Sequence, residues 1–127
     1  MTDSRTKGKN GELQLARRLR ELGFTDARRG HGQGAGGSVS EADVVGLPGV
    51  HIECKRYKIM YPGLLQKALG QAAASAKPDE TPIVMHRDDH GPWLVTSRKG
   101  NTFVTMPLES WVEWYSKEYL PIIMKEE

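Results

Sequence analysis

Two carboxylates and one lysine occur at a spacing that a β-hairpin can bring together. Asp43 is followed, after nine intervening residues, by the tripeptide Glu53-Cys54-Lys55. Because side chains alternate between the two faces of a strand, Glu53 and Lys55 should share one face while Cys54 points to the other. A hairpin would then set Asp43 beside them, so that two carboxylates and an ammonium group meet at one edge of a sheet.

This combination of side chains suits metal-assisted hydrolysis of a phosphodiester. Carboxylate oxygens bind Mg²⁺, which keeps several waters and accepts phosphate as a further ligand, and Mn²⁺ is an expected substitute. A metal held in this way polarises the phosphate and lowers the pKa of a bound water. The lysine can orient or help deprotonate that water, or neutralise charge in the transition state. A surface salt bridge between strand neighbours remains open as the plain alternative, because these residue types are common.

Length and composition indicate a single domain over residues 1–127. The chain has 38% hydrophobic and 27% charged residues, and it contains one cysteine. No stretch reaches the roughly 18 apolar residues of a membrane span, and the N-terminal segment lacks the apolar core of a signal peptide. A single cysteine cannot form an internal disulfide, which favours a reducing compartment. We therefore expect a cytoplasmic protein without membrane contact, in the host cytoplasm if a phage encodes it.

The charge of the chain is unevenly distributed. Residues 1–60 contain eleven Lys and Arg against seven Asp and Glu, whereas residues 61–127 contain seven against nine. A basic half points to a polyanionic partner such as nucleic acid. Ordinary solvated charge on a small protein explains the same numbers equally well at this level.

The first half of the chain predicts one helix and three strands. We expect residues 1–8 to be flexible and a helix over about 11–22, with Asn10 as its N-cap. The apolar face of this helix should contain Leu13, Leu15, Ala16, Leu19 and Leu22. Strands are expected over 24–29, 42–47 and 50–56, the last two joined by a tight turn at Pro48-Gly49. The glycine-rich segment 30–38 should be a mobile loop.

The second half of the chain predicts a helix over 62–77, strands over 82–87, 93–97 and 102–105, and a last helix over 107–119. The last helix is dense in aromatic residues, with Trp111, Trp114, Tyr115 and Tyr119. Core packing accounts for some of them, and a contact between two copies of the chain would suit the rest. The order of elements predicts a mixed α/β domain.

Three segments together resemble the PD-(D/E)XK nuclease superfamily. They are Glu12 in the first helix, Ala42-Asp43-Val44-Val45, and Ile52-Glu53-Cys54-Lys55. Within that superfamily the chain is similar to the Holliday junction resolvases of archaea and phages, over about residues 8–97. The resemblance implies a single restriction-endonuclease-like domain with a central mixed β-sheet flanked by helices. Its expected order is an α-β-β-β-α-β-β core plus a C-terminal helix.

The resemblance also implies a role for each residue of the motif. Glu12, Asp43, Glu53 and Lys55 would be catalytic, the lysine assisting the attacking water. The three acidic side chains and the backbone carbonyl of Cys54 would face the metal. Glu12 has a second interpretation as a glutamate in the first turn of a helix, where the helix dipole favours it. The Cys54 side chain itself is expected to be a small buried hydrophobe.

The chain departs from the family pattern at two places. Ala42 stands where many members have a proline before the aspartate. The exonuclease branch carries a Q-x-x-x-Y motif on the helix after the lysine strand, but here Gln71 is followed by Ser75. The exonuclease branch is therefore less well matched. Gln71 remains a further candidate for the site, against the interpretation as an exposed helix glutamine.

The glycine loop needs separate treatment because Gly32, Gly34 and Gly37 spell G-x-G-x-x-G. A dinucleotide site needs a helix to open at this motif, whereas a strand is predicted to follow here. No phosphate-binding G-K-[S/T] sequence occurs either, so we expect no nucleotide cofactor. By resemblance the loop closes over DNA, although a solvated loop without contacts is an equal alternative.

The candidate DNA contacts are the cations and polar groups near the motif, namely Lys7, Lys9, Arg28, Arg29, His31, Ser38, Arg56 and Lys58. By contrast, His86 to His90 is expected to be a hairpin turn, and a metal site there is a minor alternative.

The sequence thus predicts a Mg²⁺-dependent, structure-selective endonuclease for four-way DNA junctions, acting in recombination and repair. Because such a junction is two-fold symmetric and needs two opposed cuts, a homodimer on branched DNA is expected. The alternatives are a restriction-like or repair nuclease on duplex or single-stranded DNA, and a DNA-binding protein that does not cleave.

Overall fold

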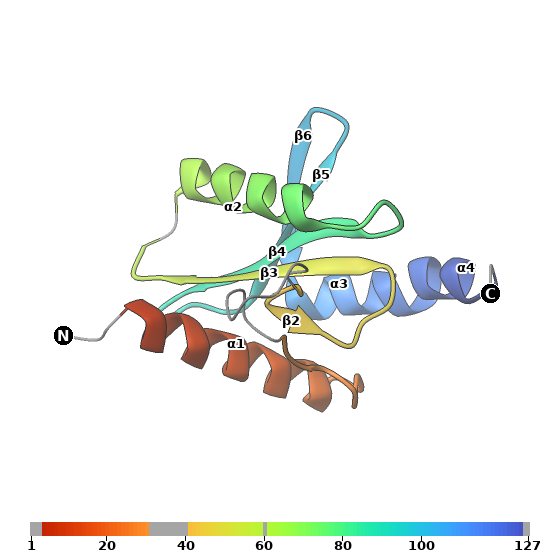
Figure 1. Ribbon diagram of the computed structural model, residues 1–127, viewed down its shortest axis with the longest axis horizontal. Coiled ribbons are helices and arrows are strands. Elements are labelled where there is room, and N and C mark those ends of the chain that lie inside the picture. Colours follow the sequence, from red (N-terminus) through yellow and green to blue (C-terminus); the bar gives the residue numbers. More distant parts are fainter. Residues whose placement is uncertain (1–3, 31–40, 60, 126–127) are drawn as a thin grey trace.

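A six-stranded mixed sheet forms the centre of the molecule and carries helices on both faces (Figure 1). The computed structural model describes residues 4–30, 41–59 and 61–125. In chain order the elements are α1 (Ser4–Glu21), β1 (Arg28–Arg29), β2 (Val44–Val45), β3 (Val50–Tyr57), α2 (Pro62–Ser75), β4 (Thr81–Asp88), β5 (Leu94–Lys99), β6 (Thr102–Pro107), α3 (Leu108–Trp114), the π-helix η1 (Tyr115–Tyr119) and α4 (Leu120–Lys125).

The strands lie in the sheet in the order in which they occur in the chain, from β1 to β6. Strands β3 and β4 are parallel and pair over eight residues, with Lys55 opposite His86. A parallel pair needs a crossover connection, and α2 supplies it. All other neighbouring strands are antiparallel. The expectation of a mixed sheet flanked by helices is therefore confirmed.

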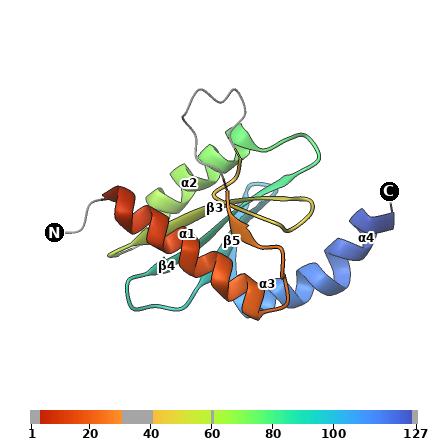
Figure 2. The same cartoon turned by 60° about the horizontal axis from the view of Figure 1, so that its bottom comes forward.

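The main core lies between one face of the sheet and the helices α1 and α3, which cover that face. Figure 2 shows α1 crossing it. Along β3 the side chains alternate as predicted. Ile52 and Cys54 are buried in this core, whereas Glu53 and Lys55 point to the other face. A smaller cluster of Ala68, Leu69 and Val84 joins α2 to that second face. Small side chains on α2 let the helix lie close to the sheet.

The first helix differs from its prediction at its start and in its apolar face. It begins at Ser4 rather than near Gly11, so residues 4–8 of the segment expected to be flexible are helical, and residues 1–3 lie outside the described residues. Lys7 is anchored by Asp89, whose Oδ1 lies 3.0 Å from the lysine Nζ. Leu13 is 46% exposed and does not belong to the core. The buried stripe is Leu15, Ala16 and Leu19, with Leu22 partly buried beside it.

Several other boundaries also differ. Strands β1 and β2 have only two residues each, where longer strands were expected, and the single C-terminal helix of the prediction is interrupted by η1. Gly30 does not belong to a mobile loop, because it is buried and its N–H donates to the carbonyl of Asp43 at 2.9 Å. A Cβ there would collide with the carbonyl oxygen of Ala42. Residues 31–38 of the predicted loop lie outside the described residues.

Two tyrosines of the C-terminal helices hold the turn between β2 and β3. The hydroxyl of Tyr115 donates to the carbonyl of Pro48 at 2.6 Å, and the hydroxyl of Tyr119 donates to the carbonyl of Gly49 at 2.8 Å. Gly49 has a φ of +79°, which favours glycine, and a Cβ there would meet Ile123. This turn sets the register of β2 on β3, with Val44 opposite Ile52. Within the described ranges, every helix is too short or too polar to cross a membrane.

We expect Tyr115→Phe to lower the free energy of unfolding by about 1 kcal/mol, because it removes one hydrogen bond to a backbone carbonyl. Urea denaturation followed by circular dichroism measures this change. Tyr61→Phe makes the same chemical change on a side chain that is 58% exposed and should leave the midpoint unchanged. Equal midpoints for the two variants would contradict the role of the tyrosine in holding this turn.

Candidate active site

A cleft of about 820 Å³ opens beside the C-terminal half of β3, between the N-terminal half of α1 and the C-terminal half of α2. It exists because β2 is so short: its only pairing with β3 is Val44 opposite Ile52. Within the described residues, the edge of β3 that faces β2 therefore has no strand beside it from Glu53 to Tyr57, whereas its other edge pairs with β4. The cleft gathers the acidic and basic residues of the predicted motif, namely Glu12, Asp43, Glu53 and Lys55.

The central pair of the cleft comes from one strand. Glu53 and Lys55 point to the same face of β3, and the lysine Nζ lies 3.2 Å from Glu53 Oε2. Both side chains are largely buried, with exposed fractions of 16% for Glu53 and 26% for Lys55. This ion pair is the salt bridge between strand neighbours that the spacing alone left open as an alternative. The pair is, however, inside a cleft that contains two further carboxylates.

Asp43 fills the place that a longer β2 would occupy. Its backbone N–H donates to the carbonyl of Ile52 at 3.0 Å, and its Oδ2 accepts the backbone N–H of Cys54 at 2.9 Å. The side chain thus satisfies a strand-edge donor that would otherwise have no partner. Within the described residues, Asp43 Oδ1 makes no hydrogen bond and is available to a ligand in the cleft.

Glu12 reaches the cleft from α1. It precedes Leu15 by three residues and Ala16 by four, so it lies on the helix face that packs against the sheet. Its Oε1 accepts the Nε–H of Arg29 at 2.6 Å, and its side chain is 17% exposed. The dipole interpretation of Glu12 as a first-turn residue does not hold, because the helix begins eight residues earlier.

The surroundings of Glu12 and Glu53 in the cleft disfavour the ionised form of both carboxyl groups. Burial raises the pKa of Glu53, and the negative charge of Asp43 raises it further. Burial also raises the pKa of Glu12, although the hydrogen bond from Arg29 offsets part of this effect. Burial acts to lower the pKa of Lys55, but Glu53 outweighs it, and the net pKa is above the usual value. Lys55 is therefore an ammonium ion at neutral pH, which favours orientation and charge neutralisation over proton abstraction.

The donor set of the cleft fits a hard divalent cation. Asp43 and Glu53 each have a carboxylate oxygen that takes no hydrogen bond within the described residues. Mg²⁺ is commonly held by one or two carboxylates, with water and phosphate as its other ligands. Among the described residues, no group of three or more His, Cys, Asp or Glu side chains is arranged to hold a metal. Asp43 and Glu53 alone would leave most ligand positions of such a cation to water or phosphate, and Glu12 is bound to Arg29.

The side chain of Cys54 belongs to the core, although the residue lines the cleft. Burial raises the pKa of its thiol well above the usual value, and the carboxylates of Asp43 and Glu12 add to the shift. A neutral thiol at physiological pH is a poor nucleophile.

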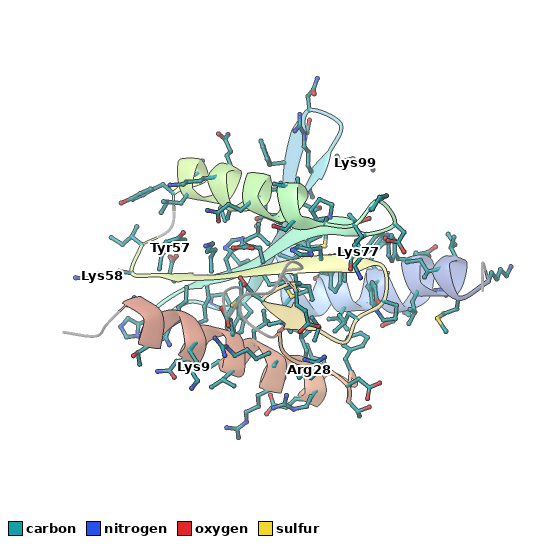
Figure 3. All side chains as sticks on the ribbon, in the orientation of Figure 1. Lys9, Arg28, Tyr57, Lys58, Lys77 and Lys99 are labelled. Atoms are coloured by element: carbon teal, nitrogen blue, oxygen red, sulfur yellow. The ribbon has the colours of Figure 1, made fainter. Side chains whose placement is uncertain are left out.

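The predicted DNA contacts divide into two groups. Lys7, Arg56 and Lys58 line the cleft, and so does the candidate Gln71. Figure 3 shows Lys58 and Tyr57 at the end of β3 and Lys9 on the outer side of α1.

Among the described residues, the other predicted contacts, Lys9, Arg28 and Arg29, do not line the cleft. Arg28 is paired with Glu41 at 3.7 Å, and Arg29 is bound to Glu12. Both arginines are thus paired within the protein, and their contact with phosphate stays a prediction. His31 and Ser38 lie outside the described residues.

Asp89 is a contributor to the cleft that the sequence analysis missed. It lies in the turn between β4 and β5, with Oδ1 at 3.0 Å from Lys7 Nζ and 3.5 Å from Arg56 Nε. Two cations of the cleft wall are thus held from behind by one carboxylate. The hydrogen bond from Lys7 lowers the pKa of Asp89. The contact spans 82 residues of sequence, so only a polar turn was visible beforehand.

His86 is bonded inside the sheet and, among the described residues, belongs to no group arranged to hold a metal. It is buried on β4, and its Nε2 is 2.7 Å from Thr96 Oγ1. Burial lowers its pKa to about 4, so the ring is neutral at physiological pH.

Comparison with family models, with curated proteins and with solved structures finds no match to this chain.

We expect Glu53→Gln to raise the free energy of unfolding at pH 7.5 relative to the wild type. The folded-state pKa of Glu53 is above its unfolded value, so the folded protein prefers the neutral carboxyl and loses stability as the pH rises through that pKa. The advantage of the neutral amide should therefore shrink as the pH falls through the folded-state pKa towards about 4.5, below which the wild-type carboxyl is protonated in both states. Urea denaturation at several pH values measures it.

Glu118→Gln is the matched control for this prediction, because Glu118 is exposed on η1. It should show no comparable dependence on pH. A difference between Glu53→Gln and wild type that stays constant from pH 4 to pH 7.5 would rule out the buried-charge explanation.

Proposed function

We propose that the protein is a Mg²⁺-dependent, structure-selective DNA endonuclease that hydrolyses phosphodiester bonds at four-way junctions. The observation that carries the proposal is the meeting of Asp43, Glu53 and Lys55 in one cleft with cations on its wall. The resemblance of these segments to the PD-(D/E)XK nucleases, and within them to junction resolvases, supports the same activity. The mixed sheet flanked by helices is compatible with it.

In this proposal Asp43 and Glu53 hold the metal, Glu12 adds negative charge to the site, and the backbone carbonyl of Cys54 is a further ligand. The metal, when bound, polarises the scissile phosphate and supplies an activated water. Mn²⁺ would substitute for Mg²⁺. Burial, and after it the negative charge of Asp43, raises the pKa values of Glu12 and Glu53, and a bound divalent cation would offset this cost of ionisation.

The other residues of the cleft position the DNA strand. The Lys55 ammonium group orients the attacking water and neutralises charge that develops on the phosphate. Lys7, Arg56 and Lys58 hold flanking phosphates. Arg29 keeps the Glu12 carboxylate in place through its hydrogen bond. A water oxygen bonds to phosphorus as the bond to the 3′ oxygen breaks, and the products are a 5′-phosphate and a 3′-hydroxyl.

Two clefts are needed for the two opposed cuts that resolve a junction. A homodimer with two-fold symmetry would place them on opposite strands. Trp114 on α3 is 45% exposed and stacks at a tilt on Tyr119, which makes the C-terminal helices a suitable contact between copies. Acting on branched DNA would assign the protein to recombination and repair.

We expect the protein to nick an end-labelled four-way junction at symmetric positions in the presence of Mg²⁺ and not in EDTA. Lys55→Ala and Asp43→Asn should each reduce the cleavage rate by about 100-fold or more, because they remove charge from the reacting phosphate or its metal. Lys99→Ala removes the same group from the distant β5–β6 hairpin (Figure 3) and should cleave at the wild-type rate.

A duplex and a single strand of matching sequence distinguish the alternatives in the same assay. Equal cutting of linear DNA would keep the nuclease site and move the function to a restriction-like or repair nuclease. Tight junction binding without cutting in Mg²⁺ or Mn²⁺ would make the chain a DNA-binding protein and contradict the proposed activity.

A further inference from the structure

Two large apolar side chains stand exposed just outside the cleft. Ile59 is 63% exposed and Tyr61 is 58% exposed, and both lie on the connection from β3 to α2. Exposed apolar groups of this size beside a functional cleft indicate a surface that something covers.

In the chain, these two residues follow shortly after residues that line the cleft. Tyr57 and Lys58, which precede Ile59, both line it. Figure 3 shows Tyr57 and Lys58 at the end of β3. Lys58 is exposed and has no ion pair within the described residues. A cation of the cleft wall is therefore followed immediately by an apolar side chain, which matches the alternation of phosphate and base along a DNA strand.

Tyr61 has a defined position because α2 begins there. It is the N-cap residue of α2, Pro62 takes the first position of the helix, and the Tyr61 carbonyl accepts the N–H of Leu64 at 3.0 Å. Proline is preorganised for this position of a helix. The start of α2 thus fixes the backbone position from which the Tyr61 side chain extends.

Tyr61 also lines a smaller pocket of about 300 Å³. Apolar side chains of α2 and of the β4–β5 connection form much of it, among them Pro62, Leu65 and Pro92. Its polar groups include Asp88 and His86, whose ring is neutral because burial lowers its pKa to about 4. No lysine or arginine of the described residues lines this pocket.

The two pockets therefore differ in charge in the way that the two parts of a nucleotide differ. The cleft contains three carboxylates, but it also contains four cations that can hold phosphates, namely Lys7, Lys55, Arg56 and Lys58. The smaller pocket has an aromatic ring, apolar walls and the carboxylate of Asp88, and within the described residues it has no cation to hold a phosphate. An uncharged planar base fits such surroundings, because bases stack on aromatic side chains without regard to sequence.

We propose that Ile59, Tyr61 and the smaller pocket receive an unstacked base of the DNA whose backbone enters the cleft. This inference rests on the proposed function, because it requires DNA in the cleft. In a continuous duplex every base is paired and stacked, and placing one here costs the energy of unstacking it. At a branch point the bases separate more easily. The apolar connection thereby favours branched DNA over duplex, which the catalytic residues alone do not do.

The test compares variants of the full-length protein for binding to a four-way junction and to a duplex of the same sequence, with Ca²⁺ in place of Mg²⁺ so that the DNA stays intact. Fluorescence anisotropy gives both dissociation constants. Ile59→Ala combined with Tyr61→Ala should weaken junction binding about tenfold and leave duplex binding unchanged. Tyr61→Phe keeps the ring and should bind like the wild type.

Phe103→Ala is the matched control. Phe103 on β6 is another exposed apolar side chain, with an exposed fraction of 41%. The β5–β6 hairpin extends away from the connection between β3 and α2 and from the C-terminal helices (Figure 1). Removal of the Phe103 ring should change neither constant. Photo-crosslinking from 5-iodouracil placed at the branch point gives a second measurement that needs no destabilising variant, and the crosslink should map to Tyr61.

The outcomes separate this inference from the proposed function. A wild type that binds and cuts junctions, with a ratio of junction to duplex affinity that the double variant leaves unchanged, overturns the base site alone. Equal weakening for junction and duplex also overturns it, because the contacts would then be to the backbone in general. A wild type that binds no DNA removes the proposed function as well, and a protein partner for this surface would then be the interpretation to pursue.

Discussion

The hydrogen bond from the backbone N–H of Cys54 to Asp43 Oδ2 is the contact on which the cleft depends. A longer β2 would pair with β3 past Ile52 and cover its edge with backbone. Here β2 pairs with β3 at one residue only, and the Asp43 side chain then accepts the next hydrogen bond in place of backbone. The edge of β3 beyond it stays open. The same carboxylate satisfies the strand and places negative charge beside Glu53. The turn held by Tyr115 and Tyr119 keeps β2 in the register that makes this contact.

The cleft is held together by compensated charges rather than by apolar packing. Glu53 is paired with Lys55, Glu12 with Arg29, and Asp89 with Lys7. The compensation is incomplete for the carboxylates, because burial still raises the pKa of Glu12 and Glu53. Sites that bind charged ligands commonly carry such a cost in stability, which the ligand offsets when it binds. The excess negative charge at the centre and the positive charge on the wall are what a metal ion and a phosphate backbone would each need.

The sequence predicted those parts of the site that depend on local periodicity. The alternation in β3 correctly separated Glu53 and Lys55 from Ile52 and Cys54, because a strand with one buried face has only one register. The position of Glu12 follows from the phase of α1 once Leu15, Ala16 and Leu19 are recognised as the buried stripe. Including Leu13 in that stripe, where it is 46% exposed, obscured the phase.

The parts that depend on contacts distant in sequence could not be predicted. The first turns of α1 are polar, and their order comes from Lys7 meeting Asp89 across 82 residues. Arg29 looked free for DNA because its partner, Glu12, lies on a different element. The shortness of β2 depends on a single side-chain hydrogen bond that no propensity describes. The fold class and the strand that carries Glu53 and Lys55 thus follow from pattern, whereas the open edge and the charged wall follow from tertiary structure.

Direct titration of metal binding tests the central claim, that Asp43 and Glu53 form a divalent cation site in this cleft. Electron paramagnetic resonance counts free Mn²⁺ in the absence of DNA, and competition with Mg²⁺ gives the affinity of the natural ion. The account predicts binding by the wild type that Asp43→Asn and Glu53→Gln each weaken at least about tenfold, while Glu118→Gln leaves it unchanged. Binding of equal strength in wild type and Asp43→Asn, or no binding by the wild type, would contradict the account.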